Sequence, residues 1–129
     1  MALFKTNLEP LRFTRLWFSL AYAMLAIVAI ASLMPAPDIG TSDKLLHFLT
    51  YGVMSAVFVT LVSRQRSLFL VVPGLILFGV VLEFLQGMTG YRSMEALDML
   101  ANGTGVMIGL MVRFSPIPVW FRRLELILP

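Results

Sequence analysis

The chain has 129 residues, which is the size of a single domain. Hydrophobic residues make up 59% of it and charged residues only 13%, whereas soluble domains contain about 25% charged residues. Because so few charges cannot cover a water-facing surface, the composition predicts an integral membrane protein formed by one domain, residues 1–129. The absence of cysteine excludes disulfides, cysteine-based zinc sites and thiol nucleophiles, and the single histidine excludes sites built from several histidines.

Stretches without charge mark the predicted membrane spans. A helix that crosses a hydrocarbon core about 30 Å thick needs about 20 mainly apolar residues. No formal charge separates Arg15 from Asp38, which predicts a first span over residues 16–34. The basic start and the Ala29-Ile30-Ala31 stretch of this span also resemble a signal peptide, whose cleavage would leave the orientation of the other spans unchanged. Three further spans are predicted over residues 45–63, 67–86 and 97–114, and the last two carry acidic residues near one end.

Lysine and arginine in the short loops predict the orientation of these spans, because cytoplasmic loops carry an excess of both. Eight basic residues fall on the side of the two termini and two on the other side. We therefore expect an all-α four-helix bundle with both termini in the cytoplasm. The eight are Lys5, Arg12, Arg15, Arg64, Arg66, Arg113, Arg122 and Arg123, and the two are Lys44 and Arg92.

The two ends of the chain carry residues typical of a membrane interface. Trp17 and Trp120 suit the aromatic belt at the headgroup level. Pro116 and Pro118 are expected to end the fourth span. The segment from Val119 to Leu128 mixes apolar residues with Arg122 and Arg123, which predicts a short interfacial helix.

With this topology, polar side chains of three spans gather in one layer near the outer surface. Lys44, His47 and Tyr51 share one face of the second span, at spacings i, i+3 and i+7. Charge at this depth is costly and usually marks a site or a paired network. The candidate ligand-binding residues are Asp43, Lys44, His47, Tyr51, Glu83, Gln86, Arg92, Asp98 and Asn102.

Most of these residues also have a structural interpretation. Gly105 and Gly109 continue the Asp98 stripe and are predicted to let another helix approach closely. Asp43 or Ser42 could cap the second span. Two acids in one membrane layer need partners, and Arg92, Lys44 and His47 could form a purely structural salt-bridge network with them.

The same residues resemble the signatures of the VanZ-like family. The run Asp43-Lys44-Leu45-Leu46-His47-Phe48-Leu49-Thr50-Tyr51 resembles the D-K-x-x-H-F-x-x-Y element of that family. Glu83-Phe84-Leu85-Gln86 resembles its E-x-x-Q element, and Arg92, Asp98, Asn102, Gly105 and Gly109 resemble its R…D…N-x-x-G-x-x-x-G element. The resemblance covers residues 43–109, about half of the chain. It implies a bacterial cytoplasmic-membrane protein near cell-envelope chemistry, in a family named for a protein associated with resistance to the glycopeptide teicoplanin.

Binding is the first of three functions that the polar layer could support. An outward-facing pocket would hold the headgroup of a membrane lipid, a lipid-linked cell-wall precursor or a glycopeptide. Arg92 and Lys44 would contact phosphate or carboxylate oxygens. The acids and amides would accept hydrogen bonds from sugar or peptide donors.

An intramembrane enzyme is the second hypothesis. Glu83, Asp98 and His47 are the candidate catalytic residues for acid–base chemistry. They could also hold one metal ion, but no metal-binding motif is present, and the sequence predicts neither a metal nor another cofactor. Transport ranks last because no polar stripe runs the full depth of a span, and the basic residues form no separate patch for nucleic acid. Action through an unidentified protein partner remains a further alternative, and the oligomeric state is left open.

Overall fold

The computed structural model describes residues 7–35 and 41–129. These residues form α1 (Thr14–Leu33), α2 (Thr41–Leu61), α3 (Leu68–Met88), α4 (Ala96–Leu110) and α5 (Ile117–Ile127). Two short 3-10 helices, η2 (Gln65–Ser67) and η3 (Met111–Phe114), precede α3 and extend α4. The described part of the chain contains no β-strand, only an isolated bridge between Asn7 and Arg64, so the predicted all-α class is confirmed.

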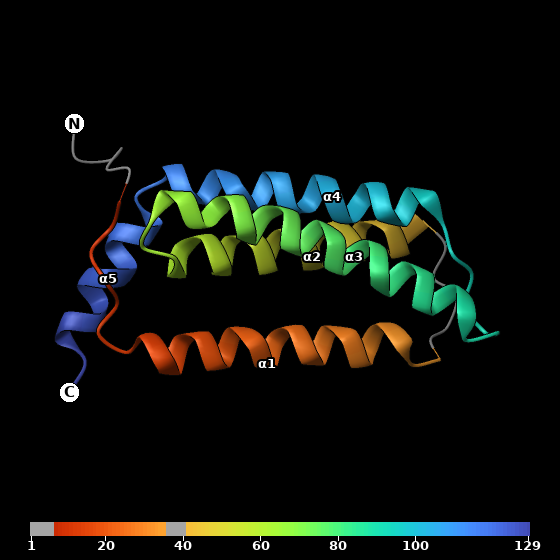
Figure 1. Cartoon of the computed structure of the whole chain (residues 1–129), viewed down its shortest axis with the longest axis horizontal. Coiled ribbons are helices and arrows are strands. Elements are labelled where there is room, and N and C mark those ends of the chain that lie inside the picture. The colour runs from red at the N-terminus through yellow and green to blue at the C-terminus, as the bar shows by residue number, and fades with distance from the viewer. Residues whose placement is uncertain (1–6, 36–40) are drawn as a thin grey trace.

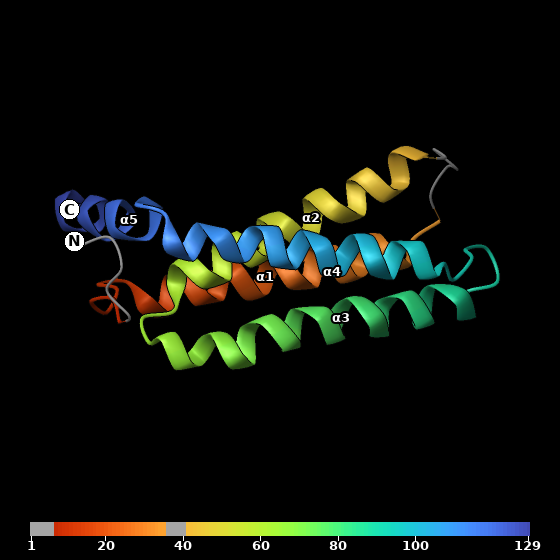
Figure 2. The ribbon, with the colours of Figure 1, turned by 90° about the horizontal axis from the view of Figure 1, so that it is seen from above.

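The four long helices run side by side along the length of the molecule, and α5 lies across one end (Figures 1 and 2). At that end, called here the α5 end, α1 and α3 begin and α2 and α4 finish. The opposite end, called here the site end, holds the last turns of α1 and α3 and the first turns of α2 and α4. The start of α1 and the C-terminus therefore lie at the same end of the bundle.

The tightest contact in the bundle joins α2 to α4, and glycine makes it possible. Gly105 and Gly109 are buried on α4. A Cβ atom at either position would collide with the backbone of α2, at the carbonyl oxygens of Phe48 and Gly52. The close approach predicted from the small-residue stripe is present, and its partner surface on α2 includes a third glycine. This packing turns the face of Asp98 and Asn102 toward α2.

The core sits between α2, α3 and α4, and α1 covers it from one side. Met54, Phe58 and Val106 are among the most deeply buried apolar residues. On α1 only Ala21 is buried, although Trp17 and Val28 are among the residues that pack against the core. Because α1 contributes so little buried surface, it is the least embedded of the four long helices.

Within the described part of the chain, three helices are long and apolar enough to cross a membrane, namely Thr14–Leu33, Asp43–Leu61 and Gln65–Met88. The fourth span differs from the prediction of one helix over 97–114. The α-helix ends at Leu110, continues as a 3-10 helix to Phe114, and meets α5 at an angle of 63°. The number of candidate spans rises to four when this bent pair is counted as one.

Two smaller expectations need correction. The proposed cap of α2 at Ser42 or Asp43 is wrong, because the helix already begins at Thr41 and Asp43 lies in its first turn. The residue before Thr41 lies outside the described residues. The prolines do not both terminate the fourth span: Pro116 caps α5, and Pro118 lies in the first turn of that helix, where a missing N–H costs little.

Candidate polar site at the end of the bundle

Lys44 connects the first turns of α2 and α4. Its Nζ lies 2.7 Å from Glu95 Oε2 and 3.3 Å from Asp98 Oδ1. Asp98 is only 3% exposed, because the glycine contact described above turns its face of α4 against α2. The amphipathic spacing and the glycine stripe thus place a buried carboxylate beside the ammonium group of Lys44.

His47 lies at the centre of the polar residues on α2 and α4. Its Nε2 is 3.7 Å from Asp43 Oδ2, one turn back on the same helix, and 3.9 Å from Asp98 Oδ2. Its Nδ1 is 3.0 Å from Asn102 Oδ1, and Asn102 is 2% exposed. With the amide oxygen of Asn102 as acceptor, the imidazole donates through Nδ1 and presents Nε2 to the two carboxylates.

Glu83 ties the end of α3 to the start of α4. Its Oε1 accepts a hydrogen bond of 2.7 Å from the backbone N–H of Glu95, the residue that caps α4. The side chain is buried, at 1% exposure, and within the described residues its Oε2 accepts no hydrogen bond. The sequence predicted a basic side chain as the partner of Glu83, but the hydrogen bond to Glu83 comes from the backbone N–H of Glu95.

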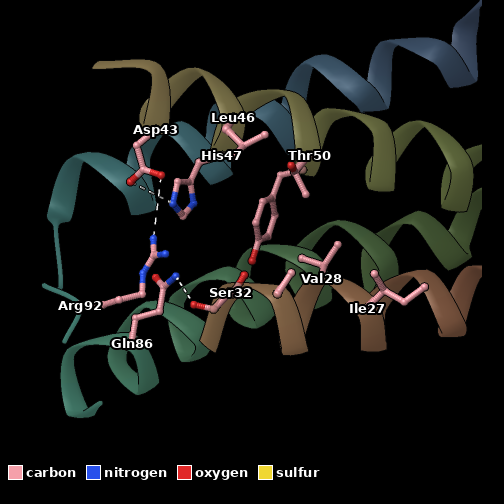
Figure 3. A pocket seen from close by; sticks show the side chains of 11 residues that line it. Ile27, Val28, Ser32, Asp43, Leu46, His47, Thr50, Gln86 and Arg92 are labelled. Atoms are coloured by element: carbon pink, nitrogen blue, oxygen red, sulfur yellow. Dashed lines mark hydrogen bonds and ion pairs between the residues drawn. The ribbon is translucent and has the colours of Figure 1, made fainter. Parts of the chain in front are cut away.

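A pocket of about 390 Å³ opens at the site end between α1, α2 and the end of α3 (Figure 3). Polar side chains line one part of it, and Arg92 Nη2 lies 3.9 Å from Asp43 Oδ1 across this part. Gln86 also lines the pocket, but its Nε2 donates to the carbonyl oxygen of Ser32 at the end of α1. The lining residues are Ile27, Val28, Ala31, Ser32, Asp43, Leu46, His47, Thr50, Tyr51, Gln86 and Arg92.

An apolar groove of about 500 Å³ lies between α1 and α2, closer to the α5 end than the pocket is. Met24 of α1 and Val53 of α2 line the groove. Each is one helical turn from a residue of the pocket, Val28 and Thr50 respectively. The groove lining is Trp17, Leu20, Ala21, Met24, Val53, Ala56, Val57, Thr60, Leu61, Val112, Ile117 and Phe121.

Eight of the nine predicted ligand-binding residues lie toward the site end and Tyr51 lies at the middle of α2, and they have different surroundings. Asp43, His47, Tyr51, Gln86 and Arg92 line the pocket. Behind these lining residues, Asp98 and Asn102 lie buried on α4 and contact His47. Lys44 is partly exposed beside Asp98, and Glu83 is joined to the group through Glu95. Of the three candidate catalytic residues, only His47 lines the pocket.

Three side chains of this group could hold a metal ion. One ligand atom from each of Asp43, His47 and Asp98 lies within 4.8 Å of the others. The sequence reading considered Glu83, His47 and Asp98 as such a set. Within the described residues the structure places Asp43 in the cluster and not Glu83, because Asp43 is one helical turn from His47 on α2.

A second set of buried polar side chains lies at the α5 end and was not predicted from the sequence. Arg113 and Arg122 are 6% and 8% exposed, and both donate to carbonyl oxygens at the end of α2. Glu125 accepts from the backbone N–H groups of Arg12 and Phe13 at the start of α1, and from the Trp17 indole. A signal existed, because Arg122 and Glu125 share a face of the amphipathic α5 segment at i, i+3.

The burial pattern of α5 inverts that of a soluble amphipathic helix. Its charged residues Arg122 and Glu125 are buried, whereas Trp120, Leu124 and Ile127 are more than half exposed. The predicted helix is present, and Arg122 lies on its buried face while Arg123 is exposed. The guanidinium is buried because the free carbonyls at the end of α2 need a donor.

A comparison with family models finds one match, described as VanZ/LLP1, over residues 2–116. This range includes the whole pocket and every predicted site residue. No curated protein and no solved structure shows significant similarity to the chain.

Proposed function

The chain belongs to the VanZ/LLP1 family of apolar, helical membrane proteins, and on this premise we propose that it binds the headgroup of a cell-envelope lipid or lipid-linked precursor. The headgroup occupies the pocket at the site end, and one acyl chain occupies the apolar groove. The observation that carries the proposal is that the linings of the two follow one another along α1 and α2, one helical turn apart.

The dimensions of the pocket and groove suit a lipid. Together they extend from Trp17 to Ser32 on α1. At 1.5 Å per residue this is about 22 Å, longer than half of a hydrocarbon core about 30 Å thick. One leaflet of lipid therefore fits along the groove with its headgroup at the polar end. The shallow embedding of α1 leaves this region open to lipid from the side.

The charges favour a mixed headgroup over a simple anion. Among the described residues of the site end, the carboxylates of Asp43, Glu83, Glu95 and Asp98 face two permanent cations, Lys44 and Arg92. A zwitterionic or glycosylated headgroup offers donors to the carboxylates and acceptors to Arg92, whose guanidinium suits phosphate and carboxylate oxygens.

The site end faces outward in this proposal. Arg113 and Arg122 are buried against backbone carbonyls, so they are weak evidence for orientation. Without these two, the basic residues still number six at the side of the termini against two at the site end. The positive-inside rule therefore continues to favour cytoplasmic termini.

Binding ranks above catalysis because of where the ionisable groups lie. Glu83 and Asp98 are buried behind the pocket lining, so neither reaches a ligand in the pocket directly. Acid–base chemistry on such a ligand would depend on His47, the one candidate catalytic residue in the lining.

Native mass spectrometry of the gently solubilised protein tests the proposal. We expect the wild type to retain a defined lipid, and Arg92→Ala and Ala31→Trp to lose it. The first removes the pocket guanidinium, and the second places a bulky side chain at a lining position on α1. Ala23→Trp is the matched control, because Ala23 is exposed on α1 and lines neither pocket nor groove. Equal lipid retention by all four folded proteins would refute the proposal.

A further inference from the structure

We propose that Asp43, His47 and Asp98 bind a divalent transition-metal ion at the inner edge of the pocket. The inference deepens the proposed function, and rests on it only where the bound headgroup is concerned. One ligand atom of each side chain lies within 4.8 Å of those of the other two, and His47 Nε2 faces both Asp43 Oδ2 and Asp98 Oδ2. The distances from Nε2 to the two oxygens, 3.7 and 3.9 Å, are too long for hydrogen bonds.

The remaining polar atom of each side chain has its own partner. Asp43 Oδ1 faces Arg92 at 3.9 Å, and Asp98 Oδ1 faces Lys44 at 3.3 Å. His47 Nδ1 contacts Asn102 Oδ1 at 3.0 Å. Metal-ligating histidines and carboxylates are oriented by outer partners of this kind, which fix the histidine tautomer and point its other nitrogen at the ion.

Unbalanced buried charge gives an independent reason for a cation. Within the described residues, two carboxylate oxygens are buried and accept no hydrogen bond, Asp98 Oδ1 and Glu83 Oε2. Lys44 neutralises the charge of Asp98 only in part, because its ammonium group lies closer to Glu95, at 2.7 Å, than to Asp98. Neither oxygen is a proposed ligand atom, so the ion acts on the charge of the side chains and not on these oxygens directly. Buried carboxylates are costly unless they are paired or coordinate a metal, and a divalent ion beside Asp98 Oδ2 would supply positive charge to this carboxylate.

The ligand atoms indicate the class of metal. One imidazole nitrogen and two carboxylate oxygens suit Zn²⁺ or Mn²⁺ better than Ca²⁺, which takes six to eight oxygen ligands. Three protein ligands leave at least one coordination position open. Because Asp43 and His47 line the pocket, that position faces the space assigned to the headgroup. A phosphate or carboxylate oxygen of the headgroup could bind there, which would allow an anionic ligand at a site rich in carboxylates.

Competition with a fluorescent chelator measures the binding of Zn²⁺ to the full-length protein, after treatment with a stronger chelator and its removal. We expect one Zn²⁺ per chain. His47→Gln and Asp98→Asn should weaken binding at least about 100-fold, and Asn102→Ala about 10- to 100-fold, as is usual for an outer partner. Glu9→Gln is the matched control, because this acid is exposed at the α5 end and is not a ligand in the cluster, and it should bind Zn²⁺ like the wild type.

Circular dichroism and gel filtration show which variants are folded, and His47→Gln decides the question if Asp98→Asn does not fold. Absence of Zn²⁺ binding by the wild type, or wild-type affinity in folded His47→Gln, would overturn the inference. Lipid retention is measured in parallel, with and without chelator. Lipid retained without any Zn²⁺ binding would overturn the metal site alone. Zn²⁺ binding without lipid retention would overturn the proposed function alone.

Discussion

The two ends of the bundle both bury charge, but they satisfy it in different ways. At the α5 end, the side chain of Arg122 donates to five carbonyl oxygens at 2.6–3.4 Å. Glu125 receives three N–H groups at 2.5–3.2 Å. At the site end, Asp43, His47, Asp98 and Arg92 face one another at 3.7–3.9 Å, and two buried carboxylate oxygens accept no hydrogen bond within the described residues.

The difference separates a structural network from a binding site. At the α5 end, α5 supplies a cation to the negative end of the α2 dipole and an anion to the positive start of α1. The guanidinium of Arg122 and the carboxylate of Glu125 are already hydrogen-bonded to backbone groups and to the Trp17 indole, so they do not offer a binding site for a ligand. At the site end, buried carboxylates that each keep one oxygen without a hydrogen bond, within the described residues, are a cost to stability, which proteins retain mainly where function needs it.

The largest effect is expected from Arg122→Ala. The change leaves several buried carbonyl oxygens without a donor, each of which costs about 1–3 kcal/mol when it stays unsatisfied. We expect the free energy of unfolding to fall by about 3 kcal/mol, allowing for partial compensation by Arg113 and water. Thermal unfolding in detergent, followed by circular dichroism, measures the loss.

Arg123→Ala is the control for this change, because the neighbouring arginine is exposed and its side chain makes no hydrogen bond or ion pair with the residues that the structure describes. Its effect on stability should stay within about 0.5 kcal/mol. If both variants unfold at the same temperature, the α5 end is not the closed structural network described here.

The next effect concerns the glycines that hold the site end together. Gly105→Ala places a methyl group against the backbone of Phe48 and should destabilise the protein by about 1–3 kcal/mol, as overpacking usually does. Gly103→Ala, on the same helix, meets nothing within 4 Å and should stabilise it by up to about 1 kcal/mol through helix propensity. Thermal unfolding of the two variants in one detergent compares them, and equal changes in stability would contradict the close contact of α2 and α4.

The site end could be predicted from sequence because its side chains follow helical spacing. Asp98, Asn102, Gly105 and Gly109 mark one stripe, and the alternating topology places the polar turns of three helices at one depth. What spacing could not provide was the pairing across helices. Asp98 of α4 reaches His47 of α2 because the glycine contact brings these two helices together, whereas Glu83 of α3 accepts from the backbone N–H of Glu95.

The α5 end could not be predicted because its partners are backbone groups. Every residue has a backbone carbonyl, so the sequence does not show which carbonyl oxygens at the end of α2 need a donor. A count of basic residues therefore cannot distinguish the buried Arg113 and Arg122 from the exposed Arg123. The 63° bend after Phe114, which brings Arg122 and Glu125 onto the ends of α2 and α1, is likewise a tertiary feature.

The smallest effect is expected from Glu83→Gln at the site end, and its sign, compared with that of Glu125→Gln at the α5 end, is the test. Glu83→Gln keeps an oxygen that accepts from the Glu95 N–H, and it removes a buried charge whose second oxygen lacks a hydrogen bond. We expect the free energy of unfolding to stay the same or rise by up to about 1 kcal/mol. Glu125→Gln instead turns an NH₂ group toward N–H donors, because both of its oxygens are occupied, and should lower the free energy of unfolding by about 1–3 kcal/mol. Chemical denaturation of both variants in the same detergent gives the two values.

A loss of stability in Glu83→Gln as large as that in Glu125→Gln would mean that the site end is a structural network like the α5 end. Opposite signs would mean that the charge at Glu83 is held against the stability of the fold, as expected for a group kept for a ligand or a metal ion.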